Sequence, residues 1–195
     1  MNDKKIILAS ASPRRKQLME MLGLDFEILK PVTNEQFDNL LCIDENIKNI
    51  TYKKACSIID KYSILNALII AADTVVIHGG TVLTKPKDDI EAFNMLQKLS
   101  SQTHEVLTGV YVLDTLSGKA IYKSKKTKVT FKNITQAEIS AYIASGEPFD
   151  KAGAYGIQGL GSVFINRIEG CFYNVVGLPI SLLYDLLKEF DIYIL

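Results

Sequence analysis

The stretch that decides the fold is IILASASPRRK, residues 6–16. Its apolar, β-branched beginning predicts a strand over residues 5–9. Ser12 is a favourable N-cap, and Pro13 suits the first turn of a helix, so a helix is predicted over residues 13–22. The chain therefore begins with a strand that leads directly into a helix.

The first turn of this predicted helix carries two arginines, Arg14 and Arg15. Acidic residues are more common there because they complement the helix dipole, so cations lower the stability of the helix. Free backbone N–H groups, the positive end of the dipole and two guanidinium groups together suit a phosphate. We therefore expect an anionic ligand at this position. A basic helix start that is merely solvated is the structural alternative.

Strand-like and helix-like segments alternate along the rest of the chain. Further strands are predicted over residues 26–29, 67–77, 81–83 and 163–168, with a long hairpin over 105–114 and 120–131. Further helices are predicted over residues 44–62, 88–99, 135–144 and 178–190, two of them opened by capping boxes at Asp88 and Thr135. This alternation indicates an α/β fold, with a mixed twisted sheet and flanking helices. Without a linker or an internal repeat, residues 1–195 are predicted to form a single domain.

Composition and charge exclude several classes of protein. The 195 residues carry 22 Lys and Arg against 22 Asp and Glu. A net charge of zero argues against a nucleic-acid coat protein or a polybasic membrane anchor. The apolar runs are too short to cross a bilayer. From the charge and the apolar runs together, neither a nucleic-acid nor a membrane partner is expected. Three cysteines without a C-x-x-C pair indicate free thiols in a reducing cytoplasm.

Asp73 interrupts the most apolar strand of the sequence, IIAADTVV at residues 69–76. An ionised carboxylate is costly in apolar surroundings unless it is paired, bound to a metal or placed at the open end of a strand. The carboxyl ends of strands in α/β sheets face the ligand crevice. Asp73 is therefore predicted to be a metal ligand or a general base rather than a surface charge.

Two more segments have the chemistry of ligand contacts. In K-P-K-D, residues 85–88, Pro86 favours an extended Lys85, whose ammonium suits a phosphate, although solvated turns have the same composition. Four glycines within residues 153–161 allow close backbone approach, and Gln158 among them offers a donor and an acceptor to a base edge. A tight loop near a sheet edge is the alternative. The sequence contains no P-loop and no dinucleotide fingerprint.

Five blocks in this order span nearly the whole chain: S-A-S-P-R-R (10–15), A-D-T-V-V (72–76), K-P-K-D (85–88), D-K-A-G-A-Y-G-I-Q-G (150–159) and N-V-V-G-L-P-I (174–180). Together they resemble the Maf family of nucleoside triphosphate pyrophosphatases. The resemblance implies an ITPase-like architecture of two lobes around a deep cleft, commonly as a homodimer. It also implies hydrolysis of a nucleoside triphosphate to the monophosphate and pyrophosphate, dependent on a divalent cation, Mg²⁺ or Mn²⁺.

The resemblance further implies a role for each matching position. Asp73 matches the catalytic proton acceptor, and Asp73 with Glu35 would hold the metal. The positions that set substrate choice match Arg14, Thr74 and Gln158. The positions that line the triphosphate match Ser10, Arg15, Lys54 and Lys85. One departure is Asn34, which stands before Glu35 where many members have a second acid.

Arg14 directly after Pro13, together with the full block at residues 150–159, resembles the branch of the family that acts on dTTP and UTP. The expected function is therefore hydrolysis of dTTP, UTP and modified pyrimidine nucleotides, which cleans the nucleotide pool and has a link to cell-division arrest. One alternative is a non-catalytic nucleotide-binding regulator of septum formation. Another is the branch specific for 7-methyl-GTP, which typically has a bulky aromatic residue after that proline.

Overall fold

The computed structural model describes residues 4–195, which fold into two compact units built from non-contiguous segments. Unit 1 contains residues 4–73, 108–125 and 177–195, and unit 2 contains residues 74–107 and 126–176. The sheet has seven strands in the described chain, in the order β2-β1-β3-β5-β6-β7, with β4 paired to β3. This confirms the mixed α/β sheet, whereas the single domain and the cleft between two lobes stay predictions.

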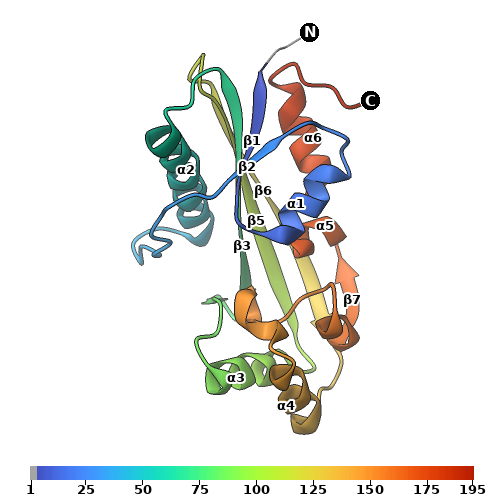
Figure 1. Cartoon of the computed structure of the whole chain (residues 1–195). Helices are drawn as coiled ribbons and strands as arrows, with labels where there is room; N and C mark the ends of the chain where they lie inside the picture. Colours follow the sequence, from blue (N-terminus) through green and yellow to red (C-terminus); the bar gives the residue numbers. More distant parts are fainter. Residues whose placement is uncertain (1–3) are drawn as a thin grey trace. The chain divides into compact units, whose positions relative to one another are not determined.

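The elements follow the predicted order (Figure 1). The strands are β1 (Lys5–Ala9), β2 (Glu27–Leu29), β3 (Ala67–His78), β4 (Thr81–Leu83), β5 (Thr103–Asp114), β6 (Ala120–Phe131) and β7 (Ile165–Glu169). The helices are α1 (Pro13–Glu20), α2 (Ile43–Tyr62), α3 (Asp89–Leu99), α4 (Gln136–Ala144), α5 (Phe172–Val176) and α6 (Ile180–Lys188). Three short 3₁₀ turns are η1 (Glu147–Asp150), η2 (Ala152–Ala154) and η3 (Leu160–Phe164). In the described residues, no helix is both long and apolar enough to cross a membrane.

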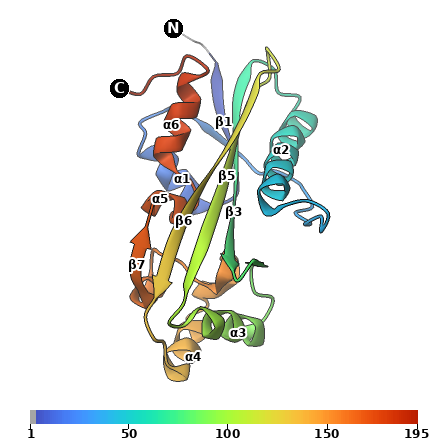
Figure 2. The same cartoon turned by 180° about the vertical axis from the view of Figure 1, so that it is seen from behind.

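Unit 1 has helices on both faces of its part of the sheet. Figures 1 and 2 both show α2 on one side of β1 and β3, with α1 and α6 on the other. Ala55 and Ile58 of α2 belong to one buried cluster with Ile69 and Ala71 of β3. Since successive side chains of a strand point to opposite faces, every second residue of β3 faces α2. Asp73 continues this series.

Unit 2 encloses an aromatic core. The rings of Phe131, Tyr155 and Phe164 pack together, with centroids 4.6 Å apart for the first two and 6.2 Å for Phe131 and Phe164. Buried His104 shares a hydrogen bond of 2.7 Å between its Nε2 and the Tyr155 hydroxyl. Burial, with the nearby charge of His78, lowers the pKa of His104 to about 4. His104 is therefore neutral at pH 7 and serves the core.

Several predicted boundaries shift. Helix α1 ends at Glu20 rather than residue 22, a difference within the usual uncertainty of helix ends. The strand predicted from residue 163 is wrong at its start, because Val163 belongs to η3 and β7 begins at Ile165. The Thr135 capping box is confirmed. At Asp88 only half of the capping box forms. Asp88 Oδ1 accepts from Glu91 N, but the Glu91 side chain accepts from Lys87 N instead of from the backbone N of Asp88.

A partly buried ion pair lies at the end of β5. Asp114 accepts hydrogen bonds from Lys4 Nζ at 2.7 Å, Ser117 Oγ at 2.6 Å and Leu116 N at 3.0 Å. Burial alone would raise the pKa of Asp114, but these donors lower it to about 2. A folded-state pKa below the unfolded one means that the carboxylate stabilises the fold at neutral pH, and that this contribution disappears as the pH falls from about 4 to 2.

Replacing Asp114 by asparagine is therefore expected to lower the free energy of unfolding at pH 7 by about 2 kcal/mol, since hydrogen bonds to a charged group are lost. The difference from the wild type should shrink as the pH approaches 2. Urea unfolding at several pH values measures both effects. The exposed Asp25→Asn is the control, and equal losses in the two variants would contradict the prediction.

Candidate functional site

Asp73 lies at the carboxyl edge of the parallel part of the sheet. Strand β1 pairs in parallel with β3, and its last residue, Ala9, is level with Ala71 and also with Leu29 of β2. Asp73 is two residues beyond that level, and β3 continues to His78 to form an antiparallel pair with β4. The carboxylate is thus in the middle of its own strand, yet just past the last residues of β1 and β2. Asp73 and Thr74 are also partly exposed and interrupt the buried run of β3.

Lys54 of α2 joins two carboxylates. Its Nζ lies 2.6 Å from Asp73 Oδ1 and 2.9 Å from Glu35 Oε1. Lys54 is only 5% exposed, whereas the adjacent Lys53 is exposed. The helix thus directs one of two neighbouring lysines towards β3, and the alternation of β3 directs Asp73 towards the helix. Three residues far apart in the sequence form one charged cluster in unit 1.

The turn between β1 and α1 brings the arginines to the same cluster. Ser12 caps the helix, its Oγ accepting from Arg15 N at 3.5 Å, and buried Ser10 Oγ accepts from Ser12 N at 3.1 Å. Burial lowers the pKa of Arg15, the carboxylates of Asp73 and Glu35 raise it, and the charge of Arg14 lowers it further. These charges therefore act on one another within unit 1.

Gly177 is a contact that the sequence did not single out. Arg15 Nε donates to the Gly177 carbonyl at 2.8 Å, which fixes the guanidinium. Gly177 has φ 124, a backbone conformation that favours glycine. The only signal in the sequence was its place in the block N-V-V-G-L-P-I.

The residues of this cluster fit a divalent cation that shares its coordination with a substrate. Asp73 and Glu35 each place an oxygen within 2.9 Å of the same ammonium group, so their oxygens converge. Mg²⁺ is typically held by one or two carboxylates together with substrate phosphates and water. Among the described residues, no group of three or more His, Cys, Asp or Glu side chains is placed to hold a metal without such help.

Lys85, Thr74 and Gln158 belong to unit 2. Lys85 and Gln158 are exposed, and Thr74 is partly buried. The Thr84 carbonyl accepts from Gly153 N at 3.1 Å, so the K-P-K-D turn lies beside the glycine-rich segment. A Cβ on Gly153 would lie 2.9 Å from Val76, which explains a glycine at this position. The roles of these three residues stay predictions.

A family model described as "Maf-like protein" matches residues 5–190. The chain belongs to the Maf family. This Maf chain is 44% identical over 195 residues to a dTTP/UTP pyrophosphatase of Caldicellulosiruptor bescii, covering 95% of this chain and 98% of that protein. It is 45% identical over 191 residues to one of Bacillus cereus, covering 98% and 92% of the two chains.

One solved structure, the Ham1 protein of Staphylococcus aureus, aligns with 83% of the Maf chain and 80% of its own chain. The identity is 14% and the TM-score 0.48. This likeness is too distant to bear on substrate or mechanism.

Proposed function

We propose that this chain hydrolyses dTTP, UTP and modified pyrimidine nucleoside triphosphates to the monophosphate and pyrophosphate, and so cleans the nucleotide pool. The observation that carries the proposal is the cluster of Asp73, Lys54 and Glu35 at the carboxyl edge of the parallel strands. The names of the similar proteins in Caldicellulosiruptor bescii and Bacillus cereus support the choice of reaction and substrate.

In this proposal Asp73 accepts the proton of the water that attacks the α-phosphorus. The bond between the α-phosphorus and the bridging oxygen breaks, and pyrophosphate leaves with the electron pair. Lys54 holds the carboxylate of Asp73 in place, as its 2.6 Å ion pair indicates. The remaining polar groups of the predicted site neutralise or orient the triphosphate. These groups are Ser10, Arg14, Arg15 and Lys85.

Selection of the base is assigned to Arg14, Thr74 and Gln158. A glutamine amide offers both a donor and an acceptor, as the paired edge of uracil or thymine requires. A Mg²⁺ or Mn²⁺ ion, when bound, would neutralise charge on the phosphate oxygens, and Asp73 and Glu35 are the residues that would hold it.

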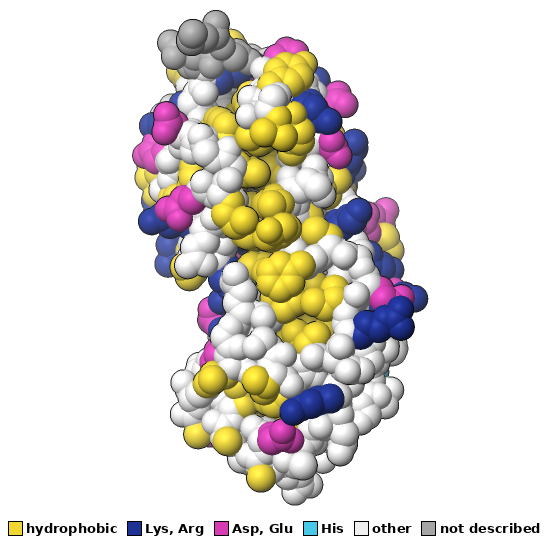
Figure 3. Space-filling model, turned by 90° about the vertical axis from the view of Figure 1, so that its right-hand side faces the viewer, with side chains coloured by type: hydrophobic (Ala, Val, Ile, Leu, Met, Phe, Trp, Pro, Cys, Tyr) yellow, Lys and Arg dark blue, Asp and Glu magenta, His cyan; other side chains and the backbone are white. Residues whose placement is uncertain are grey.

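A homodimer in the cytoplasm is part of the proposal. Figure 3 shows hydrophobic side chains exposed in each of the two units on the side that it draws, and exposed apolar patches are typical of interfaces between proteins. Exposed large apolar side chains include Met21, Val163 and Phe172. Cys42, Cys56 and Cys171 are all free, which fits a reducing compartment.

The test is pyrophosphate release from a panel of nucleoside triphosphates, with Mg²⁺, with Mn²⁺ and with EDTA. We expect metal-dependent turnover of dTTP and UTP, little turnover of purine nucleotides, and loss of activity in EDTA. Turnover of 7-methyl-GTP in preference to dTTP would instead assign the chain to the other branch. Nucleotide binding without any pyrophosphate release would favour the non-catalytic regulator.

A further inference from the structure

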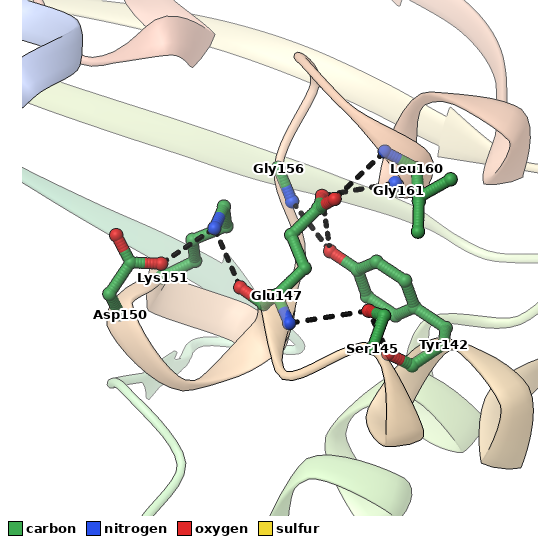
Figure 4. A network of polar contacts seen from close by, with 8 residues as sticks. All are labelled: Tyr142, Ser145, Glu147, Asp150, Lys151, Gly156, Leu160 and Gly161. Atoms are coloured by element: carbon green, nitrogen blue, oxygen red, sulfur yellow. Dashed lines mark hydrogen bonds and ion pairs between the residues drawn. The ribbon is translucent and has the colours of Figure 1, made fainter.

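Two linked side chains, Glu147 and Tyr142, hold the two ends of the loop that carries Gln158 (Figure 4). Glu147 Oε2 accepts from Leu160 N at 2.9 Å, and its Oε1 accepts from Gly161 N at 3.2 Å. Oε1 also accepts from the Tyr142 hydroxyl at 2.9 Å. That hydroxyl accepts in turn from Gly156 N at 3.3 Å. Residues 156 and 160–161 are thus tied to one pair of side chains.

The glycines of the loop fit this arrangement. A Cβ on Gly159 would lie 2.7 Å from Glu147 Oε2, and Gly159 has φ +86. A Cβ on Gly161 would lie 2.6 Å from the Gly156 carbonyl and 2.7 Å from the Tyr142 hydroxyl. A side chain at position 159 would push the loop off the Glu147 carboxylate, and one at position 161 would push it off the Tyr142 hydroxyl. These two glycines therefore serve the close contacts with Glu147 and Tyr142 and do not indicate a flexible loop.

Both the backbone and the side chain of Glu147 make hydrogen bonds within the protein. Lys151 Nζ donates to the Glu147 carbonyl at 2.6 Å and pairs with Asp150 at 2.6 Å. Burial alone would raise the pKa of Glu147, but the N–H groups of Leu160 and Gly161, with the Tyr142 hydroxyl, bring it below the usual value. Glu147 is therefore ionised at neutral pH, with both oxygens bonded to the loop and to Tyr142. A carboxylate bonded in this way organises the protein rather than contacting a polyanionic substrate.

The hydrogen-bonded ends contrast with the loop's tip. Gln158 is exposed between the residues that Glu147 and Tyr142 hold. A fixed backbone favours selection of the base, because it restricts where the Gln158 amide can lie against the base edge. Fixed ends with an exposed tip are what such selection requires.

We propose that Glu147 is a positioning residue for substrate choice: by holding residues 160–161 directly and residue 156 through Tyr142, it fixes Gln158 so that the enzyme prefers a thymine or uracil base to cytosine. The inference rests on the proposed function, in which Gln158 contacts the base. The relevant ligand feature is a ring N–H beside a carbonyl, which dTTP and UTP have and dCTP lacks.

The experiment compares kcat/KM for dTTP and dCTP in the full chain, in Glu147→Ala, in Gln158→Ala and in the double variant. We expect each single variant to lower the dTTP-to-dCTP ratio about 10-fold, as loss of a paired base contact does. The change should appear mainly in KM for dTTP. The double variant should be no worse than Gln158→Ala, because two residues that act through one contact are not additive.

A second set of variants covers the case in which Glu147→Ala fails to fold. Glu147→Gln keeps the size of the side chain but leaves one nitrogen where an acceptor is needed. Gly159→Ala disturbs the contact from the other side without altering Glu147. Gly118→Ala is the matched control, since Gly118 also has positive φ, at +72, but no heavy atom lies within 4 Å of its added Cβ. The control should leave the ratio unchanged.

Hydrogen exchange at the amides of Leu160 and Gly161 measures how well the loop is held and does not depend on turnover. We expect faster exchange in Glu147→Ala than in the wild type. An unchanged nucleotide ratio in the Glu147 and Gly159 variants, with a lowered ratio in Gln158→Ala, would overturn the positioning role alone. An unchanged ratio in Gln158→Ala would overturn the proposed route through this residue. If the wild type releases no pyrophosphate, the proposed function fails, and dissociation constants for dTTP and dCTP then test positioning by the same ratio.

Discussion

Asp73→Asn is expected to lower kcat at least about 100-fold, because a general base contributes about 10²- to 10⁴-fold and an amide accepts no proton. The fold should remain, since the amide oxygen of asparagine can still accept a hydrogen bond from Lys54. In the wild type, Lys54 Nζ lies 2.6 Å from the Asp73 carboxylate. The measurement is pyrophosphate release from dTTP under saturating substrate. Thermal unfolding of the same sample verifies that the variant is native.

A matched control for this variant is Asp60→Asn, which removes an exposed carboxylate from α2. It should retain the kcat of the wild type. Full activity of Asp73→Asn would remove Asp73 from the mechanism, whatever the metal dependence of the enzyme. A variant that fails to unfold cooperatively would be replaced by Asp73→Ser, for which the same loss of kcat is expected.

Lys54→Met is expected to lower kcat/KM for dTTP at least about 100-fold. The reason is that Lys54 is a buried cation that lies between two carboxylates and fixes the position of Asp73. Asp73 and Glu35 would then face each other without the ammonium, and the site would lose a positive charge beside a polyanionic substrate. Steady-state kinetics with dTTP over a range of Mg²⁺ concentrations measures the effect.

Lys53→Met is the natural comparison, because the adjacent lysine has the same side chain but is exposed. Its kcat/KM should stay within about 2-fold of the wild type, as expected for a surface substitution with little effect on stability. Similar losses in the two variants would mean that general charge, rather than the cluster with Asp73, accounts for the role of Lys54.

Much of this site could be predicted from the sequence because it depends on local rules. A carboxylate in an apolar strand is conspicuous, and Asp73 was found in that way. Ser12 and Pro13 predicted the helix start that carries Arg14 and Arg15, and the structure confirms both the cap and the helix. These features need only the neighbouring residues, which the sequence shows directly.

The partners in the cluster could not be derived from the residues alone. Two lysines are adjacent in α2, and only the packing of Ala55 and Ile58 on β3 turns Lys54 inward and Lys53 outward. Glu35 lies in a loop without any periodic pattern, so the resemblance to the family was needed to select it. The contact of Arg15 with Gly177 joins positions 162 residues apart, which no local rule predicts.

The glycine-rich segment shows a second limit. Its composition correctly indicated close approach, but a glycine does not reveal what approaches it. Only the structure shows that Glu147 is the neighbour of Gly159 and that Tyr142 is the neighbour of Gly161. The start of β7 was misplaced for the same reason, since hydrogen bonds to Glu147 hold the first residues of η3.

The discontinuous make-up of unit 1 has a consequence for its synthesis. Leu183, Leu186 and Leu187 of α6 are fully buried in a unit whose first segment ends at Asp73. Contacts of such long sequence separation form late, because the intervening chain must first be made and brought back. The turn with Arg14 and Arg15 thus emerges from the ribosome early but receives its Gly177 contact only after residue 177 has been added. Until then, a nascent chain has the charges of the site without its completed architecture.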